Sequence, residues 1–450
     1  MAVHETLDSW LEAQQSVHPT TIDLGLTRIT KVARVLGVDT ARCPVVTIGG
    51  TNGKGSVVAH SDALLRAAGL RTGVFTSPHL VRYNERICID GQEATDAALI
   101  DAFDRIEAAR GDTTLTYFEF NALAALLLFA DENVDVAVLE VGLGGRLDAV
   151  NMLDADVAVV ASIGFDHKDW LGDTLEAIGR EKAGIFRAGR PAVLGTPEMP
   201  ASIFETIRSL GAKPVVAEKD FHWAVHATGF NYRGPTLALE DLPPSALRGA
   251  IQFRNASTAI AAVEALGLGS RLTKEVVSQA LRTVKLPGRF HSVPGKVEWI
   301  LDVAHNEPAA RVFADHLAAQ RVEGRTIAVV GILGDKDSAT ISKLIGPWVD
   351  RWIVCSIHEP RGLPAAELAK RMGLAGQALG EAMSAAERAT AAPRANEPAA
   401  ADRSAAAPLL VDSAEEGFAA AKALAQPGDR VIVFGGFNIV GAAMRWLHVS

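Results

Sequence analysis

The sequence is poor in cysteine, and its cysteines lie far apart. The 450 residues include only Cys43, Cys88 and Cys355, with no Cys-x-x-Cys pair and no other spacing typical of a metal site. An odd number of distant cysteines also argues against a disulfide framework. The composition therefore favours a protein of the reducing cytoplasm.

The sequence also lacks a long apolar run and an excess of positive charge. Its longest purely apolar run, residues 122–130, is far too short to span a bilayer, and its first residues show no basic region followed by an apolar core. The formal net charge of −9 gives no general attraction to a phosphate backbone. We expect no export, no membrane and no nucleic acid as a partner, and we expect a monomer.

What the sequence does contain is a glycine-rich loop between a strand and a helix. The loop Gly49-Gly50-Thr51-Asn52-Gly53-Lys54-Gly55-Ser56 follows the β-branched run 45–48 and precedes a helix-like segment. In such a loop, backbone N–H groups converge on phosphate at a helix amino terminus, beside a mobile lysine. The hydroxyl that usually follows the lysine directly is delayed here to Ser56. A variant nucleoside triphosphate site is predicted, and a plain flexible turn is the alternative.

Short β-rich runs alternate with amphipathic segments along the chain, which predicts mostly parallel sheets covered by helices. The fold class is therefore α/β, with a P-loop-containing, mostly parallel sheet domain followed by a smaller, Rossmann-like α/β domain. Strands are predicted at 45–48, 71–75, 136–140, 157–162 and 191–194, then at 299–302, 326–331, 352–355 and 429–434, with a helix at 119–131.

Two segments divide the chain. Residues 286–295 have the turn residues of a hinge, so we place one domain at 1–293 and the other at 294–450. Arg289 is a charge that a passive linker would not require. Residues 381–408 are rich in alanine and interrupted by proline, which predicts a flexible surface insertion.

Polar residues at predicted strand ends are the candidates for chemistry. Glu140 ends one buried run and His167 follows another, at the edge where open α/β sheets bind ligands. Mg²⁺ prefers oxygen ligands, so a carboxylate with a hydroxyl such as Ser56 or Ser77 would suit it. From its position alone, His167 could equally be a structural residue that forms hydrogen bonds. Lys182 alone could be an exposed lysine at the end of a helix.

The second domain repeats this arrangement. Residues 302–306 and 331–337 follow predicted strands and are polar. Polar clusters at equivalent edges of two sheets predict a cleft in which two substrates are joined away from water. Helix capping and turn formation explain any one cluster equally well.

These segments together resemble the folylpolyglutamate synthase family, and within it the bifunctional bacterial dihydrofolate synthase/folylpolyglutamate synthases, which are related to the Mur peptidoglycan ligases. The resemblance runs over nearly the whole chain. It is carried by Ile22-Asp23-Leu24-Gly25-Leu26, the loop 50–56, Thr76-Ser77-Pro78-His79-Leu80, Thr116-Tyr117-Phe118-Glu119-Phe120, residues 139–148, Asp166-His167, Glu181-Lys182-Ala183-Gly184, residues 252–256, Pro287-Gly288-Arg289 and Asp302-Val303-Ala304-His305-Asn306.

The resemblance implies a role for many of these residues. Lys54, Lys182 and His167 would be catalytic, with Lys182 carbamylated so that it becomes an anion that organises the metal. The Mg²⁺ ligands would be Ser77, Glu140 and His167. The ATP contacts would be Thr51, Asn52, Gly53, Lys54, Gly55, Ser56, Asn255, Arg289, Asp302 and His305. The pterin site would comprise Asp23, Leu24, Gly25, Leu26, Arg82, Thr116, Tyr117, Phe118, Glu119, Leu147, Asp148 and Ala149.

The chemistry implied by the resemblance is ligation with ATP as co-substrate and Mg²⁺ as cofactor. A substrate carboxylate would attack the γ-phosphate to give an acyl phosphate, and the amine of L-glutamate would then displace phosphate. The acceptors would be dihydropteroate, giving dihydrofolate, and reduced folates, giving folylpolyglutamates. Glutamate would bind in the second domain, near Arg361. The chain departs from the family pattern in the 381–408 stretch and at Asn438, where a histidine is often found.

Three alternatives remain at this point. A Mur-type ligase of peptidoglycan precursor synthesis is the nearest, although the segments around Ser77 and Phe118 are of the folate type. An NAD-dependent oxidoreductase is prompted by Gly142-Leu143-Gly144-Gly145, but the third glycine of the dinucleotide pattern would fall at Leu147. A nucleotide-gated binding module without turnover is the third.

Overall fold

The structure is a computed structural model, and it describes residues 4–20, 22–320, 322–374 and 407–449. The chain divides into two compact units, Met1–Leu286 and Pro287–Ser450. This division lies a few residues before the expected boundary at 293/294, because β12 (His291–Val293) pairs with a strand of the second unit. The insertion expected at 381–408 lies outside the described residues except for its last two.

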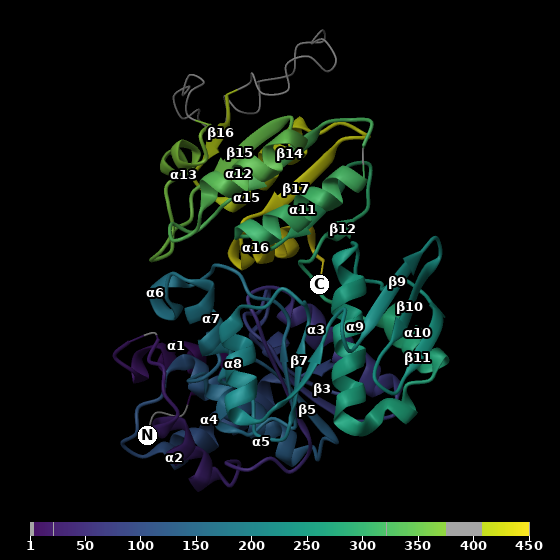
Figure 1. The fold of residues 1–450 in the computed structure, drawn as a ribbon. Helices are drawn as coiled ribbons and strands as arrows, with labels where there is room; N and C mark the ends of the chain where they lie inside the picture. The colour runs from purple at the N-terminus through teal and green to yellow at the C-terminus, as the bar shows by residue number, and fades with distance from the viewer. Residues whose placement is uncertain (1–3, 21, 321, 375–406, 450) are drawn as a thin grey trace. The chain divides into compact units, whose positions relative to one another are not determined.

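The first unit carries a large sheet with the strand order β4-β3-β2-β5-β1-β6-β7-β8 (Figure 1). Its strands are parallel except at the β3 and β4 edge. The strands are β1 (Val45–Gly49), β2 (Thr72–Phe75), β3 (Ile87–Ile89), β4 (Gln92–Glu93), β5 (Val136–Glu140), β6 (Val157–Val160), β7 (Pro191–Leu194) and β8 (Lys213–Val216).

Helices cover both faces of this sheet, and alternating strand residues point to different cores. Val45 of β1 packs in the same core as Leu123 of α5, whereas Ile48 packs with Leu64 of α3. Each fully buried aliphatic side chain contributes about 1.5–3 kcal/mol. The helices are α1 (Leu7–Val17), α2 (Thr27–Leu36), α3 (Lys54–Ala67), α4 (Asp96–Arg110), α5 (Tyr117–Asp131), α6 (Lys168–Leu171), α7 (Leu175–Ala183), α8 (Ala201–Leu210), α9 (Ile251–Val263) and α10 (Lys274–Thr283).

The local sequence explains where several of these helices begin and end. Thr116 caps α5, and its hydroxyl accepts a hydrogen bond from the N–H of Glu119 while the Glu119 carboxylate accepts one from the N–H of Thr116. Gly37 ends α2 with a φ of 70°, which an L side chain rarely adopts. These signals fix where α5 begins and where α2 ends.

A small antiparallel sheet in the first unit was not predicted. It has the order β11-β10-β9, with β9 (His222–His226), β10 (Gly229–Arg233) and β11 (Ala238–Leu242). Its inner side chains Phe230 and Tyr232 join the same core as α3 and α9. Apolar and polar residues alternate in β10, but β9 and β11 show no regular alternation that would predict them as strands.

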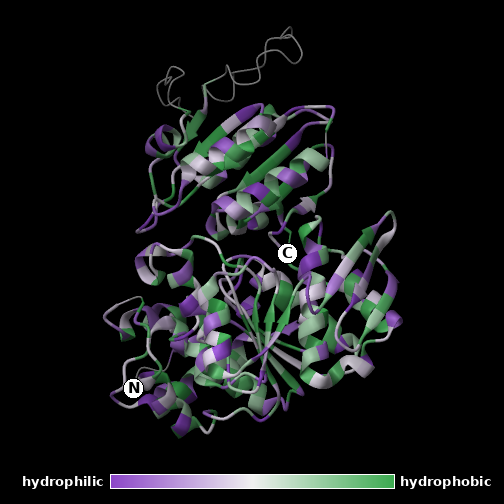
Figure 2. Cartoon of the chain, in the orientation of Figure 1, coloured by the Kyte–Doolittle hydropathy of each residue, from purple (hydrophilic) through white to green (hydrophobic). Residues whose placement is uncertain are grey.

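The second unit has a sheet in the order β12-β13-β17-β14-β15-β16, antiparallel only at β12. Figure 2 shows its central strands in the green of apolar residues, as expected of strands covered on both faces. The elements are β13 (Glu298–Asp302), α11 (Glu307–Ala319), β14 (Thr326–Val330), α12 (Ser338–Ile345), β15 (Arg351–Cys355), α13 (Ala365–Arg371), β16 (Leu409–Val411), α15 (Ala414–Leu424), β17 (Arg430–Phe434) and α16 (Phe437–Leu447).

The α/β class and the mostly parallel sheets agree with the prediction. The expected strand at 157–162 ends earlier, at Val160, because the following residues form a loop. The expected hinge at 286–295 contains β12. No helix in the described ranges is long and apolar enough to cross a membrane.

Candidate active site

The carboxyl ends of four neighbouring strands meet at one edge of the large sheet. In the order β2-β5-β1-β6, Ile48 of β1 pairs with Glu140 of β5, and Gly49 pairs with Val160 of β6. The predicted phosphate loop and the segments with the predicted metal ligands each follow one of these ends. Ligands of open α/β sheets bind at this edge. The strand order therefore groups segments that are far apart in the sequence.

The loop after β1 needs glycine at two positions. Gly50 has a φ of 135° and Gly53 a φ of 86°, which L side chains rarely adopt. A Cβ added at Gly53 would lie 3.1 Å from Oδ1 of Asn255, which belongs to α9 and was predicted to contact nucleotide. Because α3 begins at Lys54, the unpaired N–H groups of its first turn adjoin the loop.

The loop is held in place by the segment that follows β6. The N–H of Thr51 donates to the carbonyl of Ser162 at 2.7 Å, and the Ser162 hydroxyl donates to the carbonyl of Asn52 at 2.9 Å. The Thr51 hydroxyl donates to the carbonyl of Gly164 at 3.0 Å. Residues expected to continue strand β6 instead fix the shape of the phosphate loop.

Two lysine side chains converge on one carbonyl of the loop. Nζ of Lys54 and Nζ of Lys182 each donate to the carbonyl oxygen of Gly50 at 3.1 Å. Lys182 is 5% exposed. Burial, with Lys54 nearby as a second positive charge, lowers the pKa of Lys182 to about 7. Lys182 is therefore not the exposed helix-end lysine of the simpler interpretation.

The predicted metal ligands differ in how deeply their side chains are buried. Glu140 is 5% exposed, and a Cβ added at Gly55 would lie 3.9 Å from its Oε2. Ser77 is half-buried in the segment after β2, and His167 is exposed with a φ of 50°. The described part of the chain contains no group of three or more His, Cys, Asp or Glu that could hold a metal. A buried carboxylate and a hydroxyl still fit a hard divalent cation, which prefers oxygen ligands.

Part of the predicted pterin site is joined by a network that includes two unpredicted residues. Arg28 donates to Asp23 at 2.6 Å and lies 3.3 Å from the Glu119 carboxylate. Nε2 of His18 lies 3.1 Å from the Asp23 carboxylate. Burial raises the pKa of Glu119, which the N–H of Thr116 and the charge of Arg28 oppose. In the sequence, the only indication of a role for Arg28 in this network is its position just after the 22–26 stretch.

A second group of predicted pterin residues surrounds Phe118. A Cβ added at Gly142 would lie 2.7 Å from the Phe118 ring, so only glycine fits there. A carboxylate oxygen of Asp148 would lie 3.4 Å from the same Cβ, and this carboxylate accepts from the N–H of Leu143 at 2.8 Å. Burial raises the pKa of Asp148 to about 6. Leu147 is half-buried and Ala149 is buried beside it in the chain.

Two other predicted pterin residues have separate partners. Arg82 is exposed and lies 3.7 Å from Glu93 and 3.5 Å from Asp96. Tyr117 lies under the guanidinium of Arg86, 5.4 Å from its ring centroid. Leu24, Gly25 and Leu26 lead into the start of α2.

In the second unit, the predicted nucleotide residues gather around an unpredicted aromatic ring. The Arg289 guanidinium lies 5.3 Å from the Phe437 ring centroid, and the His305 ring lies 6.4 Å from it. Asp302 accepts from the N–H of Phe290 at 2.8 Å. Burial raises the pKa of Asp302, and the charge of Arg289 opposes this shift.

Two further sequence interpretations are corrected or narrowed. Residues 142–145 lead into turns and a short 3-10 helix, Ala149–Met152, and not into the helix start that dinucleotide binding requires. Arg361, the expected glutamate contact, donates to Asp335 at 3.2 Å. Asp335 thus already accepts one of the hydrogen bonds that the Arg361 guanidinium can donate.

A buried histidine that the sequence did not single out supports the loop from behind. Nδ1 of His60 donates to the carbonyl of Ser56 at 2.7 Å, and its Nε2 accepts from the hydroxyl of Ser245 at 2.8 Å. That hydroxyl in turn accepts from the N–H of Leu247 at 3.1 Å. The neutral ring therefore ties the first turn of α3 to the segment that precedes α9.

Comparisons with known proteins identify the family. Residues 48–196 match the Mur ligase middle domain, and residues 288–437 match the Mur ligase, glutamate ligase domain. The dihydrofolate synthase/folylpolyglutamate synthase of Escherichia coli is 43% identical over 367 residues, which is 82% of this chain and 86% of the relative. The chain belongs to the dihydrofolate synthase/folylpolyglutamate synthase family. The predicted family, the fold class and the ligase class of enzyme are confirmed.

Other members of the dihydrofolate synthase/folylpolyglutamate synthase family are also similar. The Mycobacterium tuberculosis enzyme is 36% identical over 79% of this chain and 78% of its own length. The structure of E. coli FolC in complex with DHPP and ADP has a TM-score of 0.88 and 38% identity, covering 99% of this chain and 98% of that chain. A bifunctional Yersinia pestis enzyme complexed with AMPPNP and Mn ion has a TM-score of 0.86 and 38% identity, with 99% of each chain covered.

The buried His60 makes stability depend on pH. Burial lowers the pKa of His60 to about 4 from 6.5. Between these pH values the unfolded state binds a proton that the folded state does not, so the free energy of unfolding falls as the pH falls from 6.5 to 4. We expect His60→Gln to reduce this loss by up to about 3 kcal/mol, measured by urea unfolding across that pH range.

His222→Gln is the matched control, since His222 is exposed on β9. Its unfolding profile should keep the wild-type dependence on pH. If His60→Gln and His222→Gln show the same dependence, the His60 ring is not held neutral in the folded protein.

Proposed function

We propose that this chain uses ATP to ligate L-glutamate to dihydropteroate and to reduced folates. The observation that carries the proposal is the phosphate loop with Lys54, which lies at the same sheet edge as the buried Glu140 in a member of this family. A carboxylate is a poor electrophile, so it must be activated before an amine can displace its oxygen. Transfer of the γ-phosphoryl group provides that activation.

The reaction proceeds in two steps. A carboxylate oxygen of the acceptor forms a bond to the γ-phosphorus of ATP, and the bond to the ADP oxygen breaks. The amine nitrogen of glutamate then bonds to the acyl carbon, phosphate leaves, and the amine loses a proton. Lys54 and the N–H groups at the start of α3 stabilise the charge on the transferring group.

The remaining assignments follow the same chemistry. Ser77, Glu140 and His167 would hold Mg²⁺, which supplies charge neutralisation at the phosphates when bound. Asn255 in the first unit, and Arg289, Asp302 and His305 in the second, would contact the nucleotide. The groups around Arg28 and Phe118 would receive the pterin. We also propose that the protein acts as a monomer in the cytoplasm.

Omission of each component tests this function. ADP release should require dihydropteroate, L-glutamate and Mg²⁺ together, and mass spectrometry should identify dihydrofolate as the product. A reduced folate should replace dihydropteroate and yield a product longer by one glutamate. ADP release that continues without the acceptor or without glutamate would reject the ligase. Turnover with only a nucleotide-sugar peptide as acceptor would favour the Mur-type alternative.

We also propose that Lys182 is carbamylated. Its pKa of about 7 leaves much of the amine neutral, and a neutral amine adds to CO₂ with loss of a proton to solvent. The carbamate would replace a buried cation by an anion and so remove the repulsion between Lys182 and Lys54. It would also add two oxygen ligands near the phosphate loop.

Carbon NMR with ¹³C-bicarbonate tests this modification directly. The wild-type protein should show a carbamate signal that grows from about pH 6 to about pH 8, as the amine deprotonates. Lys182→Arg keeps the positive charge but cannot form a carbamate, so the signal should be absent and ADP release should be lost. An unchanged signal in Lys182→Arg, or its absence in the wild type, would contradict the modification.

A further inference from the structure

A pocket lies at the opposite edge of the large sheet from the phosphate loop. It has a volume of about 230 Å³ and is formed by the segment before β1, the end of α5 and the start of β5. β1 (Val45–Gly49) separates the two sites, and at its usual rise per residue its ends are roughly 13 Å apart. The pocket is therefore distinct from the active site.

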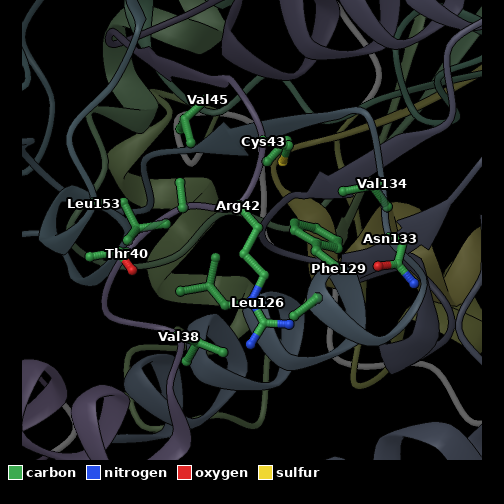
Figure 3. A pocket seen from close by; sticks show the side chains of 13 residues that line it. Val38, Thr40, Arg42, Cys43, Val45, Leu126, Phe129, Asn133, Val134 and Leu153 are labelled. Atoms are coloured by element: carbon green, nitrogen blue, oxygen red, sulfur yellow. The ribbon is translucent and has the colours of Figure 1, made fainter.

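The pocket wall is mostly apolar and carries a few polar side chains. Val38, Leu126, Phe129 and Leu153 contribute apolar surface. Figure 3 shows the Arg42 side chain extending between Leu153 on one side and Phe129 on the other. Such a wall buries an apolar body, while a few polar groups orient it.

Arg42 is the positive charge of this pocket. Among the described residues it makes no hydrogen bond or ion pair, and its side chain is exposed. Three acidic residues near this segment in sequence or near Cys43 in space have partners of their own: Asp39 lies 3.5 Å from another arginine, Asp135 accepts a backbone N–H at 2.8 Å, and Asp156 lies 2.8 Å from a third arginine. The guanidinium thus has its donors available for an external anion.

We propose that this pocket binds a small carboxylate with an apolar body. The guanidinium of Arg42 pairs with the carboxylate in a bidentate manner, and the body packs against Leu126 and Phe129. The volume has room for roughly eight to twelve non-hydrogen atoms. A ligand of this size binds with a Kd of about 1 mM. One positive charge in an apolar wall selects a monoanion over a neutral or multiply charged molecule.

Cys43 provides a reporter inside the pocket. Its thiol lines the wall and is half-buried, and burial raises its pKa, so alkylation is slow. A ligand in the pocket shields this thiol from the reagent. Cys88 is also half-buried but lies on β3, outside the pocket, and serves as a control within the same molecule.

The test measures alkylation of Cys43 in the full chain by peptide mass spectrometry. The probe is 3-phenylpropanoate, and its neutral amide, 3-phenylpropanamide, has the same shape without the charge. At a probe concentration about ten times its Kd, Cys43 alkylation should slow about tenfold, while Cys88 alkylation stays constant. The amide should give little protection.

Two matched variants separate charge from shape. Arg42→Gln should abolish protection by the acid without changing the alkylation rate of the free protein. Arg208→Gln removes an exposed arginine of α8 that is not part of the pocket wall, and protection should persist. Equal protection by acid and amide, protection retained in Arg42→Gln, or no protection of the wild-type thiol would each overturn the proposal.

Discussion

The convergence of two lysine side chains on the carbonyl of Gly50 is the constraint around which the site is organised. Lys54 reaches this oxygen from the start of α3, and Lys182 reaches it from the end of α7. Burial disfavours the charged form of Lys182, and repulsion from the ammonium group of Lys54 adds to this penalty, so the pKa of Lys182 falls to about 7. The site is therefore built for added negative charge, whether from phosphate or from a modified lysine.

The strand order explains how such distant residues come together. β1 carries the phosphate loop, and its neighbours β5 and β6 carry Glu140 and the segment that clamps the loop through Ser162. His60 supports the loop from the other face of α3 with a ring that stays neutral. The proposed carboxylate pocket lies at the opposite ends of β1 and β5. The same pair of strands therefore carries the active site at one end and the pocket at the other.

The site segments that the sequence alone can locate are those marked by a local pattern, and the roles of their residues stay predictions. The loop around Lys54 and the carboxylate at Glu140 each follow a buried run, and a run of apolar residues with a glycine-rich end is visible without any structure. The pairing of Arg28 with Glu119 and the ring of Phe437 beside Arg289 were not predictable, because these partners are 91 and 148 residues apart and leave no local pattern. The small sheet β9 to β11 was missed for a related reason: its strands mix charged and apolar residues, and only packing against α9 decides their fold.

The effect of Lys54→Ala on ADP release would decide whether the loop is the phosphate site of a ligase. The substitution removes a charge from the loop but no core packing, so the melting temperature should stay near that of the wild type. We expect kcat for ADP release to fall at least about a hundredfold, as for loss of a group that stabilises transition-state charge. Lys213→Ala, which alters an exposed lysine on β8, should leave kcat unchanged. If Lys54→Ala keeps wild-type turnover, the phosphate role of the loop is wrong.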